Sequence, residues 1–236
     1  MAPTIRDVAK LARVAPSTVS AVLNDKRYIA ADTRARVLSA IEKLDYTPSR
    51  SARGLAKRTS GNVGFIVADS HFSHAEPFYT RVFLGVEFEA RKHDLYVLLT
   101  SVAGRGARNE PMPRFLREQN VDGVMIAGRV PEKLLKDVIQ RKVPTVLVDF
   151  DGKPCDCSKV LIDNREGALL ATRHLAGLGH RAIGFIGGEK DHPSAQERLE
   201  GYRTALRQAN IDPQDEWVEF EGDTMNSTNG RIAFAR

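Results

Sequence analysis

The chain contains little of what defines several common classes of protein. Among its 236 residues there are only 2 cysteines, too few for a disulfide-rich secreted scaffold. No apolar run approaches the roughly 18 residues that a membrane-spanning helix needs. The polar, charged N-terminus also lacks the pattern of a signal peptide. We therefore expect a soluble, cytoplasmic protein with no membrane partner.

The two cysteines, Cys155 and Cys157, are separated by one residue in a segment without a helix or strand pattern. Two thiols with no further cysteine nearby are too few for a typical four-ligand metal site. We expect two reduced loop thiols, no metal site and no cofactor.

Motifs typical of enzymes are also missing. There is no Gly-x-Ser-x-Gly elbow, no paired-histidine metal motif and no nucleotide fingerprint at the first strand–helix unit. The pair Gly187-Gly188 is too little for a phosphate-binding loop. Isolated histidines are expected to be structural or exposed rather than catalytic; they are His71, His74, His174, His180 and His192. We expect that the chain is not an enzyme.

Excess positive charge is confined to the first quarter of the chain, residues 1–60, which we call the head. The head contains 12 Lys and Arg against 5 Asp and Glu, whereas the remaining residues contain 23 against 25. A basic segment on a near-neutral body is typical of nucleic-acid binding, because cationic side chains displace the counterions of phosphate groups. A solvated charged face is the simpler alternative.

Two short helices separated by a tight break are predicted within residues 4–24. Apolar residues recur there at helical spacing, at Ile5, Val8, Ala9, Ala12, Val19, Val22 and Leu23. Thr4 and Asp7 have capping-box spacing at the start of the first helix, and Pro16 suits the first turn of the second. A plain helical hairpin is the alternative interpretation of this stretch alone.

A third helix is expected at about residues 32–44, with Val37, Ile41 and Leu44 facing inward. Three helices are the minimum that buries a core around a helix-turn-helix. Pro48 then ends the pattern, because the residue before a proline is disfavoured in helical conformation. A short basic segment, residues 49–58, follows it.

These segments resemble the lactose-repressor (LacI/GalR) family of bacterial transcription regulators. The resemblance rests on residues 4–24, on Thr33-Arg34, on LDYTP at residues 44–48 and on ARGLA at residues 52–56. It implies a DNA-binding repressor with a three-helix helix-turn-helix domain and a hinge helix, followed by a body similar to periplasmic binding proteins. The implied domains are residues 1–48, the hinge and linker at 49–60, and two subdomains at 61–152 and 153–236.

The second helix of the head is expected in the major groove of DNA. Small polar side chains suited to phosphate contacts are Thr4, Thr18, Ser20, Asn24 and Thr33. The resemblance places base reading at Pro16, Ser17 and Ala21, where better-known members have longer polar side chains. Pro16 and Ala21 can only pack against a groove wall, so Ser17 alone remains for polar readout. Further expected DNA contacts are Tyr28, Arg50, Arg53 and Leu55.

Direct readout is therefore expected to be weak, and specificity to depend on the hinge. In the family the hinge folds into a helix on its operator, and the leucine that matches Leu55 enters the minor groove. An apolar wedge unstacks and bends easily kinked base steps such as CG or CA/TG. Gly54 weakens the hinge helix by roughly 1 kcal/mol relative to alanine, which makes its folding more dependent on DNA. A disordered linker without a role for Leu55 is the alternative.

Beyond Gly61 the pattern alternates between apolar strands and helices, as in a parallel, doubly wound α/β sheet. Strands are expected near residues 63–68, 96–101, 123–127, 144–149, 160–162, 182–186 and 217–220. Helices are expected near residues 77–93, 114–119, 132–141, 165–178 and 196–209. The strand near 160–162 is expected to begin a second block, after a seam near residues 151–158.

Ligands of such sheets bind outside the carboxyl ends of the strands. Candidate effector-binding residues near those ends are Asp69, His71, Asp149, His192, Ser194 and Arg198. The carboxylate of Asp149 and the guanidinium of Arg198 can hold the hydroxyl groups of a sugar-like effector, and the resemblance places effector contacts at both. The alternative pairs Arg198 with Glu197 or Glu200 and leaves Asp149 as a loop cap.

A homodimer is expected, because two heads are needed to contact both halves of a palindromic DNA operator. Effector binding would then change operator affinity, in a direction that the sequence does not reveal. The second subdomain is expected to be incomplete, because family members continue with further strands. Two alternatives stay open: a truncated DNA-binding protein without effector response, and a sugar-binding or sugar-modifying protein with an incidental basic head.

Overall fold

The computed structural model describes residues 3–26, 28–47, 59–71, 77–103, 111–152, 155–220 and 227–235. The chain divides into two compact units, the head at residues 1–60 and the body at residues 61–236. Three expected DNA contacts lie outside the described residues, namely Arg50, Arg53 and Leu55, and so does Gly54 of the hinge.

The described part of the head contains three helices close to the expected bounds: α1 (Ile5–Ala12), α2 (Pro16–Leu23) and α3 (Ala31–Lys43). The Asp7 carboxylate accepts hydrogen bonds from the backbone N–H and the hydroxyl of Thr4, at 2.8 and 2.7 Å, at the start of α1. Pro16 occupies the first turn of α2, where its missing N–H is no loss. Both local predictions about helix starts are therefore confirmed.

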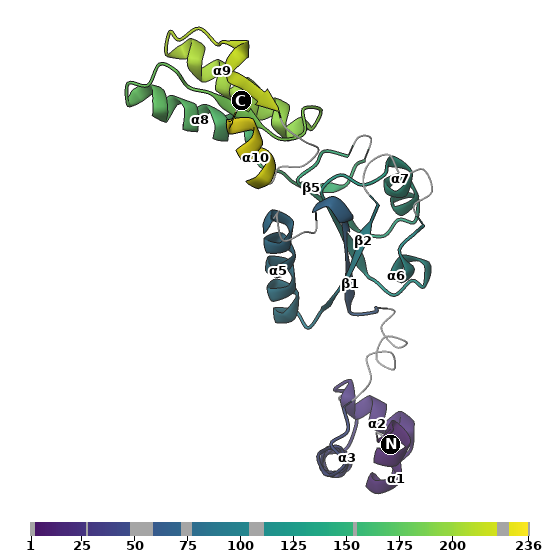
Figure 1. Cartoon of the computed structure of the whole chain (residues 1–236). Helices are drawn as coiled ribbons and strands as arrows, with labels where there is room; N and C mark the ends of the chain where they lie inside the picture. Colours follow the sequence, from purple (N-terminus) through teal and green to yellow (C-terminus); the bar gives the residue numbers. More distant parts are fainter. Residues whose placement is uncertain are drawn as a thin grey trace. The chain divides into compact units, whose positions relative to one another are not determined.

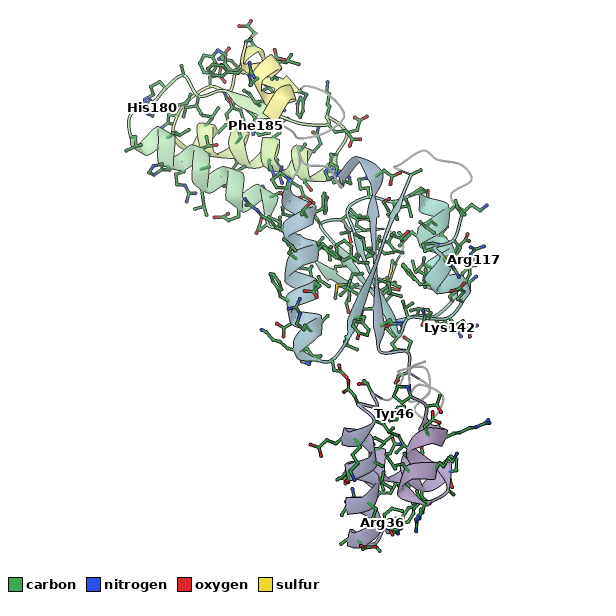
Figure 2. The ribbon with its side chains drawn as sticks, turned by 60° about the horizontal axis from the view of Figure 1, so that its bottom comes forward. Arg36, Tyr46, Arg117, Lys142, His180 and Phe185 are labelled. Atoms are coloured by element: carbon green, nitrogen blue, oxygen red, sulfur yellow. A yellow bond between two sulfur atoms is a disulfide. The ribbon has the colours of Figure 1, made fainter. Side chains whose placement is uncertain are left out.

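The apolar stripes of the three helices meet in one cluster. Its buried members are Val8, Ala9, Ala12, Val19, Val22, Val37, Ala40 and Tyr46. Val8, Val19 and Val37, one from each helix, have no exposed surface. Tyr46, labelled in Figure 2, joins the cluster from the segment after α3. Each helix thus covers apolar surface of the other two, which explains why all three are needed.

The body contains two parallel sheets, and the first has five strands in the order β2-β1-β3-β4-β5. They are β1 (Asn62–Ala68), β2 (Tyr96–Val102), β3 (Gly123–Ala127), β4 (Thr145–Val148) and β5 (Ser158–Val160). Figure 1 shows one face of this sheet against α5 (Pro77–Lys92) and the other against α6 (Arg114–Arg117) and α7 (Glu132–Gln140).

Side chains of β1 alternate between these two faces. Phe65 and Val67 pack with Phe83 of α5, and the rings of Phe65 and Phe83 meet edge to face at 5.4 Å. Ile66 belongs to the opposite cluster, with Val138 of α7. Because both faces are covered, β1 reads as a continuous apolar run, and the expected parallel α/β fold is confirmed.

The position of β5 corrects the expected seam in the body. We expected a strand near residues 160–162 to begin the second block, but β5 pairs with β4 in the first sheet, and Val148 lies opposite Val160. The backbone N–H of Asp149 extends this pairing by donating to the carbonyl of Val160 at 2.9 Å. Pairing satisfies backbone groups that would otherwise be open at the edge of β4, which explains why so short a strand joins the first sheet.

The second sheet has two parallel strands, β6 (Phe185–Gly187) and β7 (Val218–Phe220), the latter preceded by η2 (Asp215–Trp217). The associated helices are α8 (Asn164–Gly177), α9 (Pro193–Gln208) and α10 (Ser227–Phe234) (Figure 1). Tyr202 of α9 is buried and donates its hydroxyl to the carbonyl of Ile183 at 2.6 Å. Its ring also contacts Phe185, labelled in Figure 2, which ties α9 to β6.

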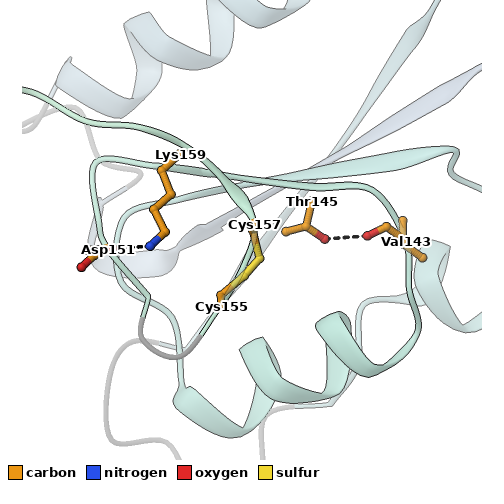
Figure 3. The surroundings of a disulfide bond; sticks show 6 residues. All are labelled: Val143, Thr145, Asp151, Cys155, Cys157 and Lys159. Atoms are coloured by element: carbon orange, nitrogen blue, oxygen red, sulfur yellow. Dashed lines mark hydrogen bonds and ion pairs between the residues drawn. A yellow bond between two sulfur atoms is a disulfide. The ribbon is translucent and has the colours of Figure 1, made fainter.

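Cys155 and Cys157 are joined by a disulfide in the segment between β4 and β5 (Figure 3). The expectation of two reduced thiols is therefore wrong for this structure. Their Cα atoms are 5.2 Å apart, which lies within the range that a disulfide spans.

Two absences hold for the described ranges of the chain. No group of three or more His, Cys, Asp or Glu side chains there is arranged to hold a metal ion. No helix in those ranges has both the length and the apolar character needed to cross a membrane.

Candidate functional sites in the head and the body

The three candidate base-reading residues of α2 lie in different environments. Pro16 and Ser17 are exposed in the first turn. Ala21, one turn further on, is only 9% exposed. Its methyl group therefore offers little surface to a thymine, and Ser17 is the exposed polar side chain of the three.

Two of the small polar side chains of the head already donate hydrogen bonds within the head. The hydroxyl of Thr4 donates to Asp7, and the side-chain amide of Asn24 donates to the carbonyl of Ser20 at 2.8 Å. Phosphate oxygens can only accept hydrogen bonds, so the Thr4 hydroxyl would have to give up Asp7 in order to bind a phosphate, whereas the Asn24 amide has two N–H groups to donate. Their expected contacts with DNA stay predictions.

The remaining candidates of the head differ in how freely they present their hydroxyl groups. Tyr28, in the turn after α2, is 77% exposed. Thr18 and Thr33 are partly buried, and the hydroxyl of Thr33 lies 3.4 Å from Nη2 of Arg36, from which it accepts. Tyr28 is thus the most accessible hydroxyl among the three.

Arg34 fixes the turn that carries Tyr28. Its guanidinium donates to the Asp25 carboxylate and to the carbonyl of Lys26, both at 2.8 Å. Asp25 itself adopts a left-handed φ of 52°, which a short polar side chain tolerates. Arg34 therefore stabilises the turn that carries Tyr28, independently of any contact with DNA.

In the body, polar side chains gather at the carboxyl ends of strands from both sheets. We call these five residues the strand-end cluster: His71 after β1, Arg129 after β3, Asp149 after β4, and Glu189 and His192 after β6. The charges of the first four all act on His192, which places them around one spot. His71 and Asp149 therefore lie near His192, as strand-end geometry predicts, whereas Asp69 of η1 (Asp69–His71) is exposed.

Asp149 is held in a defined orientation. Its backbone is left-handed, with φ of 64°, and its Oδ2 accepts a hydrogen bond from the hydroxyl of Tyr79 at 2.8 Å. The other oxygen, Oδ1, is buried and accepts no hydrogen bond from any described residue. A buried carboxylate oxygen in this state needs a donor, which a ligand hydroxyl can supply.

Gly128 allows the aromatic groups beside Asp149 to pack closely. A Cβ atom at this position would lie 2.9 Å from both the His71 ring and the Tyr79 hydroxyl, and the backbone has a φ of +71°. The rings of His71 and Tyr79 are 4.7 Å apart. Any side chain at residue 128 would therefore push the two rings away from Asp149.

His192 connects the cluster to α9. Its Nδ1 accepts a hydrogen bond from the backbone N–H of Ser194 at 3.2 Å, so the imidazole caps the helix. Burial, and next the nearby guanidinium of Arg129, hold the pKa of His192 below its ordinary value, although Glu189 and Asp149 act in the opposite direction. Ser194 is 7% exposed and contributes through its backbone rather than through an accessible hydroxyl.

One ion pair in the cluster joins the strand ends of the two sheets. Nη1 of Arg129 lies 4.0 Å from Oε1 of Glu189, at the limit of an ion pair. Both side chains are more than half buried. The pair thus brings opposite charges from the two strand ends close together.

Arg198 is held by a different network. Its Nε donates to the side-chain oxygen of Asn164 at 2.9 Å, and the Asn164 amide donates to Glu197 at 3.0 Å. Glu200 pairs instead with Arg165 at 3.2 Å. Arg198 is thus linked to Glu197 through the side chain of Asn164.

Arg198 also lines a pocket of about 410 Å³ together with Asn164, Phe185 and Tyr202. The residues around this pocket include none of the strand-end cluster. The proposition that Asp149 and Arg198 hold one ligand together stays a prediction.

Four residues in these networks were not among the candidates drawn from the sequence, namely Tyr79, Arg129, Glu189 and Asn164. Strand-end geometry nominates the stretches that contain Arg129 and Glu189, residues 127–129 and 187–198, although neither residue was singled out as an effector contact. Tyr79 gives no such signal, because it lies in the first turn of α5 and reaches Asp149 only in the folded chain.

A basic three-helix head with a helix-turn-helix, followed by a parallel α/β body with polar strand ends, defines a recognisable class of bacterial regulators. Residues 4–49 match the model of bacterial regulatory proteins of the lacI family. Residues 60–232 match the model of periplasmic binding proteins and the sugar-binding domain of the LacI family. The chain belongs to the LacI family.

Curated relatives include two proteins named HTH-type transcriptional repressor PurR. That of Aliivibrio salmonicida is 35% identical over 222 residues, which are 93% of this chain and 65% of the relative. That of Vibrio vulnificus is 31% identical over 235 residues, which are 98% of this chain and 69% of the relative. The chain thus spans about two thirds of the length of these relatives, which are repressors and not enzymes.

Solved structures of the same family resemble the chain. The lac repressor dimer bound to operator and the anti-inducer ONPF is 26% identical with a TM-score of 0.74, and the match covers 94% of this chain and 66% of that one. The complex of the transcriptional regulator CelR with cellobiose is 29% identical with a TM-score of 0.59, and the match covers 99% and 69%.

Proposed function

We propose that this chain is a LacI-type transcriptional repressor that binds a palindromic operator as a homodimer and responds to a sugar-like effector. The observation that carries the proposal is Ser17, an exposed polar side chain in the first turn of the second helix of a basic helix-turn-helix head. Family membership and the naming of its relatives as repressors support the same function.

The head supplies the DNA-binding surface. Helix α2 enters the major groove, with Ser17 and the exposed ring of Pro16 toward the bases. Tyr28 contacts the backbone from the adjoining turn. Few side chains can read bases directly, so we place much of the specificity in minor-groove insertion of Leu55 from the hinge, which favours a kinkable central step.

The body supplies the effector site at the strand-end cluster. Asp149 accepts a ligand hydroxyl at the oxygen that Tyr79 does not use, and His192 and Arg129 offer donors around it. The relative CelR was solved with cellobiose, which supports a carbohydrate as effector.

Operator binding is tested by fluorescence anisotropy with palindromic duplexes that carry a central CG step, at two salt concentrations. Ser17→Ala removes one polar base contact. It is expected to weaken binding to the preferred duplex by about 1 kcal/mol, or about fivefold in affinity. Ser39→Ala is the matched control, because Ser39 is equally exposed but lies on α3. Equal effects of the two substitutions would contradict the placement of α2 in the groove.

Two further arms of the same titration address the hinge and the effector. Leu55→Ala should reduce the preference for the palindrome over a scrambled duplex, and an unchanged preference would exclude the wedge. A panel of sugars is then added, and a sugar that shifts operator affinity should lose that effect in Asp149→Asn. Absence of any palindrome preference at either salt concentration would overturn the proposed function.

A further inference from the structure

Both cysteines of the chain lie in the segment that joins β4 to β5, which is described at residues 149–152 and 155–157. The same segment begins with Asp149 of the strand-end cluster. We propose that the Cys155–Cys157 disulfide is a reversible redox site, opened by a small thiol or a protein dithiol, and that its state controls the position of Asp149. The second part of this proposal rests on the proposed effector site.

Several hydrogen bonds and an ion pair connect this segment to its surroundings, so a shift at the cysteines is expected to shift Asp149 as well. Asp149 donates its N–H to Val160, and Cys155 donates its N–H to the carbonyl of Gly152 at 3.0 Å. Lys159 forms an ion pair with Asp151, which lies next to the disulfide in Figure 3.

Packing leaves the segment little room for adjustment. A Cβ atom at Gly152 would lie 2.8 Å from a methyl group of Leu147 and 2.9 Å from one of Leu135. Both leucines belong to the core cluster that includes Cys155, which is 8% exposed. Two separate thiols need more space than a disulfide, and the buried Cys155 has little to spare, so we expect reduction to shift the segment that leads to Asp149.

A purely stabilising role explains this disulfide poorly. A cross-link stabilises a fold mainly by restricting the unfolded chain, and the effect shrinks as the closed loop becomes shorter. Only one residue separates Cys155 from Cys157, which is close to the smallest possible loop. In a reducing compartment, the disulfides that occur are mostly transient, catalytic or redox-sensing.

The exchange reaction needs only a thiol of low molecular weight or a dithiol protein. Its thiolate attacks Sγ of Cys157, the less buried of the two sulfurs, forms a mixed disulfide and releases the Cys155 thiolate, which takes up a proton. A second thiolate then attacks the outer sulfur of the mixed disulfide and releases Cys157. In sum, the protein disulfide gains two electrons and two protons, and two external thiols become one disulfide.

Reduction changes the surroundings of Asp149 in a defined way. The bond between its N–H and Val160 and the bond between its Oδ2 and Tyr79 both depend on where the segment lies. When the segment loosens, the carboxylate spends less time in this orientation. Effector affinity is then lower in the dithiol state than in the disulfide state.

The test equilibrates the full chain in buffers of graded reduced-to-oxidised glutathione ratio, followed by alkylation and intact mass analysis. We expect two interconverting states that carry either two alkyl groups or none. Amide hydrogen exchange is then measured on peptides that cover residues 146–160. Exchange should be about tenfold faster in the dithiol state, the order expected when the closure of a very small loop is lost.

The double variant Cys155→Ser with Cys157→Ser is the matched control. Its exchange should resemble that of the reduced chain at every glutathione ratio, while peptides from α1 to α3 stay unchanged in all samples. If Cys155 and Cys157 of the natural chain never form a disulfide, or if their disulfide never opens at the most reducing ratio, the proposal of a reversible redox site is wrong. Interconversion without any change in exchange at residues 146–160 would overturn the coupling.

Operator titrations with an active sugar, in both redox states, separate this inference from the proposed function. If the sugar acts equally in both states, the control of Asp149 is wrong while the repressor function stands. If the chain binds no operator in either state, the proposed function fails, and the glutathione and hydrogen-exchange results alone decide the redox site.

Discussion

At the scale of single residues, Asp149 and His192 carry the chemistry of the body. Asp149 adopts a left-handed backbone conformation that aspartate tolerates better than most side chains, and this turn directs its carboxylate to Tyr79. His192 accepts a hydrogen bond from the helix that it caps, so the structure favours its neutral form. The orientation of Asp149 depends on a residue 70 positions away, whereas that of His192 depends on Ser194, two positions away.

We expect His192 to make the stability of the body depend on pH. Because the folded-state pKa lies below the unfolded value of 6.5, protonation favours the unfolded chain. The stabilisation is therefore complete above that value and is lost as the pH falls through and below it. Thermal unfolding of the body is measured at about pH 7.5 and about pH 5.5. The drop in stability between the two should be larger for the natural chain than for His192→Asn.

Asparagine is the suitable replacement, because its side-chain oxygen also caps a helix N-terminus but does not titrate. All other side chains are the same in both proteins, so the difference between the two melts isolates residue 192. An equal loss of stability in both proteins would show that the His192 cap does not control this pH dependence.

At the scale of helices and strands, the sequence predicted the elements well because their signals are local. The helices of the head follow from apolar spacing, the Thr4–Asp7 pair and Pro16, each of which acts within one turn. The apolar strands of the body are equally local, since a strand covered on both faces must be apolar throughout.

The errors arose where partners distant in the sequence decide the structure. Nothing in residues 158–160 reveals that they pair with β4 rather than begin a new sheet. Tyr79 could not be linked to Asp149, from which 70 positions separate it. The disulfide depends on a Cα–Cα separation of 5.2 Å between Cys155 and Cys157, which their spacing in the sequence does not specify.

Neighbouring residues of α3 allow a sharp test of the head's core. Val37 has no exposed surface, whereas Leu38 is 52% exposed. Val37→Ala should destabilise the head by about 2 kcal/mol through the cavity it leaves. A core of this size supplies only about 3–5 kcal/mol, so hydrogen exchange in all three helices should accelerate strongly and operator binding should fall.

Leu38→Ala removes more carbon atoms from the same helix, yet it should change exchange little because the leucine is mostly in water. Hydrogen exchange of peptides from α1, α2 and α3 in the full chain measures both variants without interference from the body. A larger effect at Leu38 than at Val37 would mean that the helix is rotated relative to its described position.

At the scale of the whole molecule, the body presents an apolar surface that a single copy leaves uncovered. Helix α5 packs one side on the first sheet, while its outer side exposes Phe78, Leu84 and Phe88, by 39, 43 and 57%. Leu84 and Phe88 are four residues apart and so lie on one face. Contiguous exposed apolar side chains on a helix are typical of a protein interface, and the palindromic operator that we propose requires a second copy.

We therefore expect the outer face of α5 to contribute to the homodimer. Leu84→Glu combined with Phe88→Glu would bury two unpaired carboxylates in that interface and should weaken dimerisation about a hundredfold or more. Sedimentation velocity over a range of protein concentrations measures the change, with circular dichroism to establish that the variant is folded. Leu170→Glu on α8 is the control, because Leu170 is similarly exposed, at 53%, but lies on a helix associated with the second sheet. If the α5 variant stays dimeric while folded, or if Leu170→Glu dissociates the dimer instead, the two copies meet through another surface.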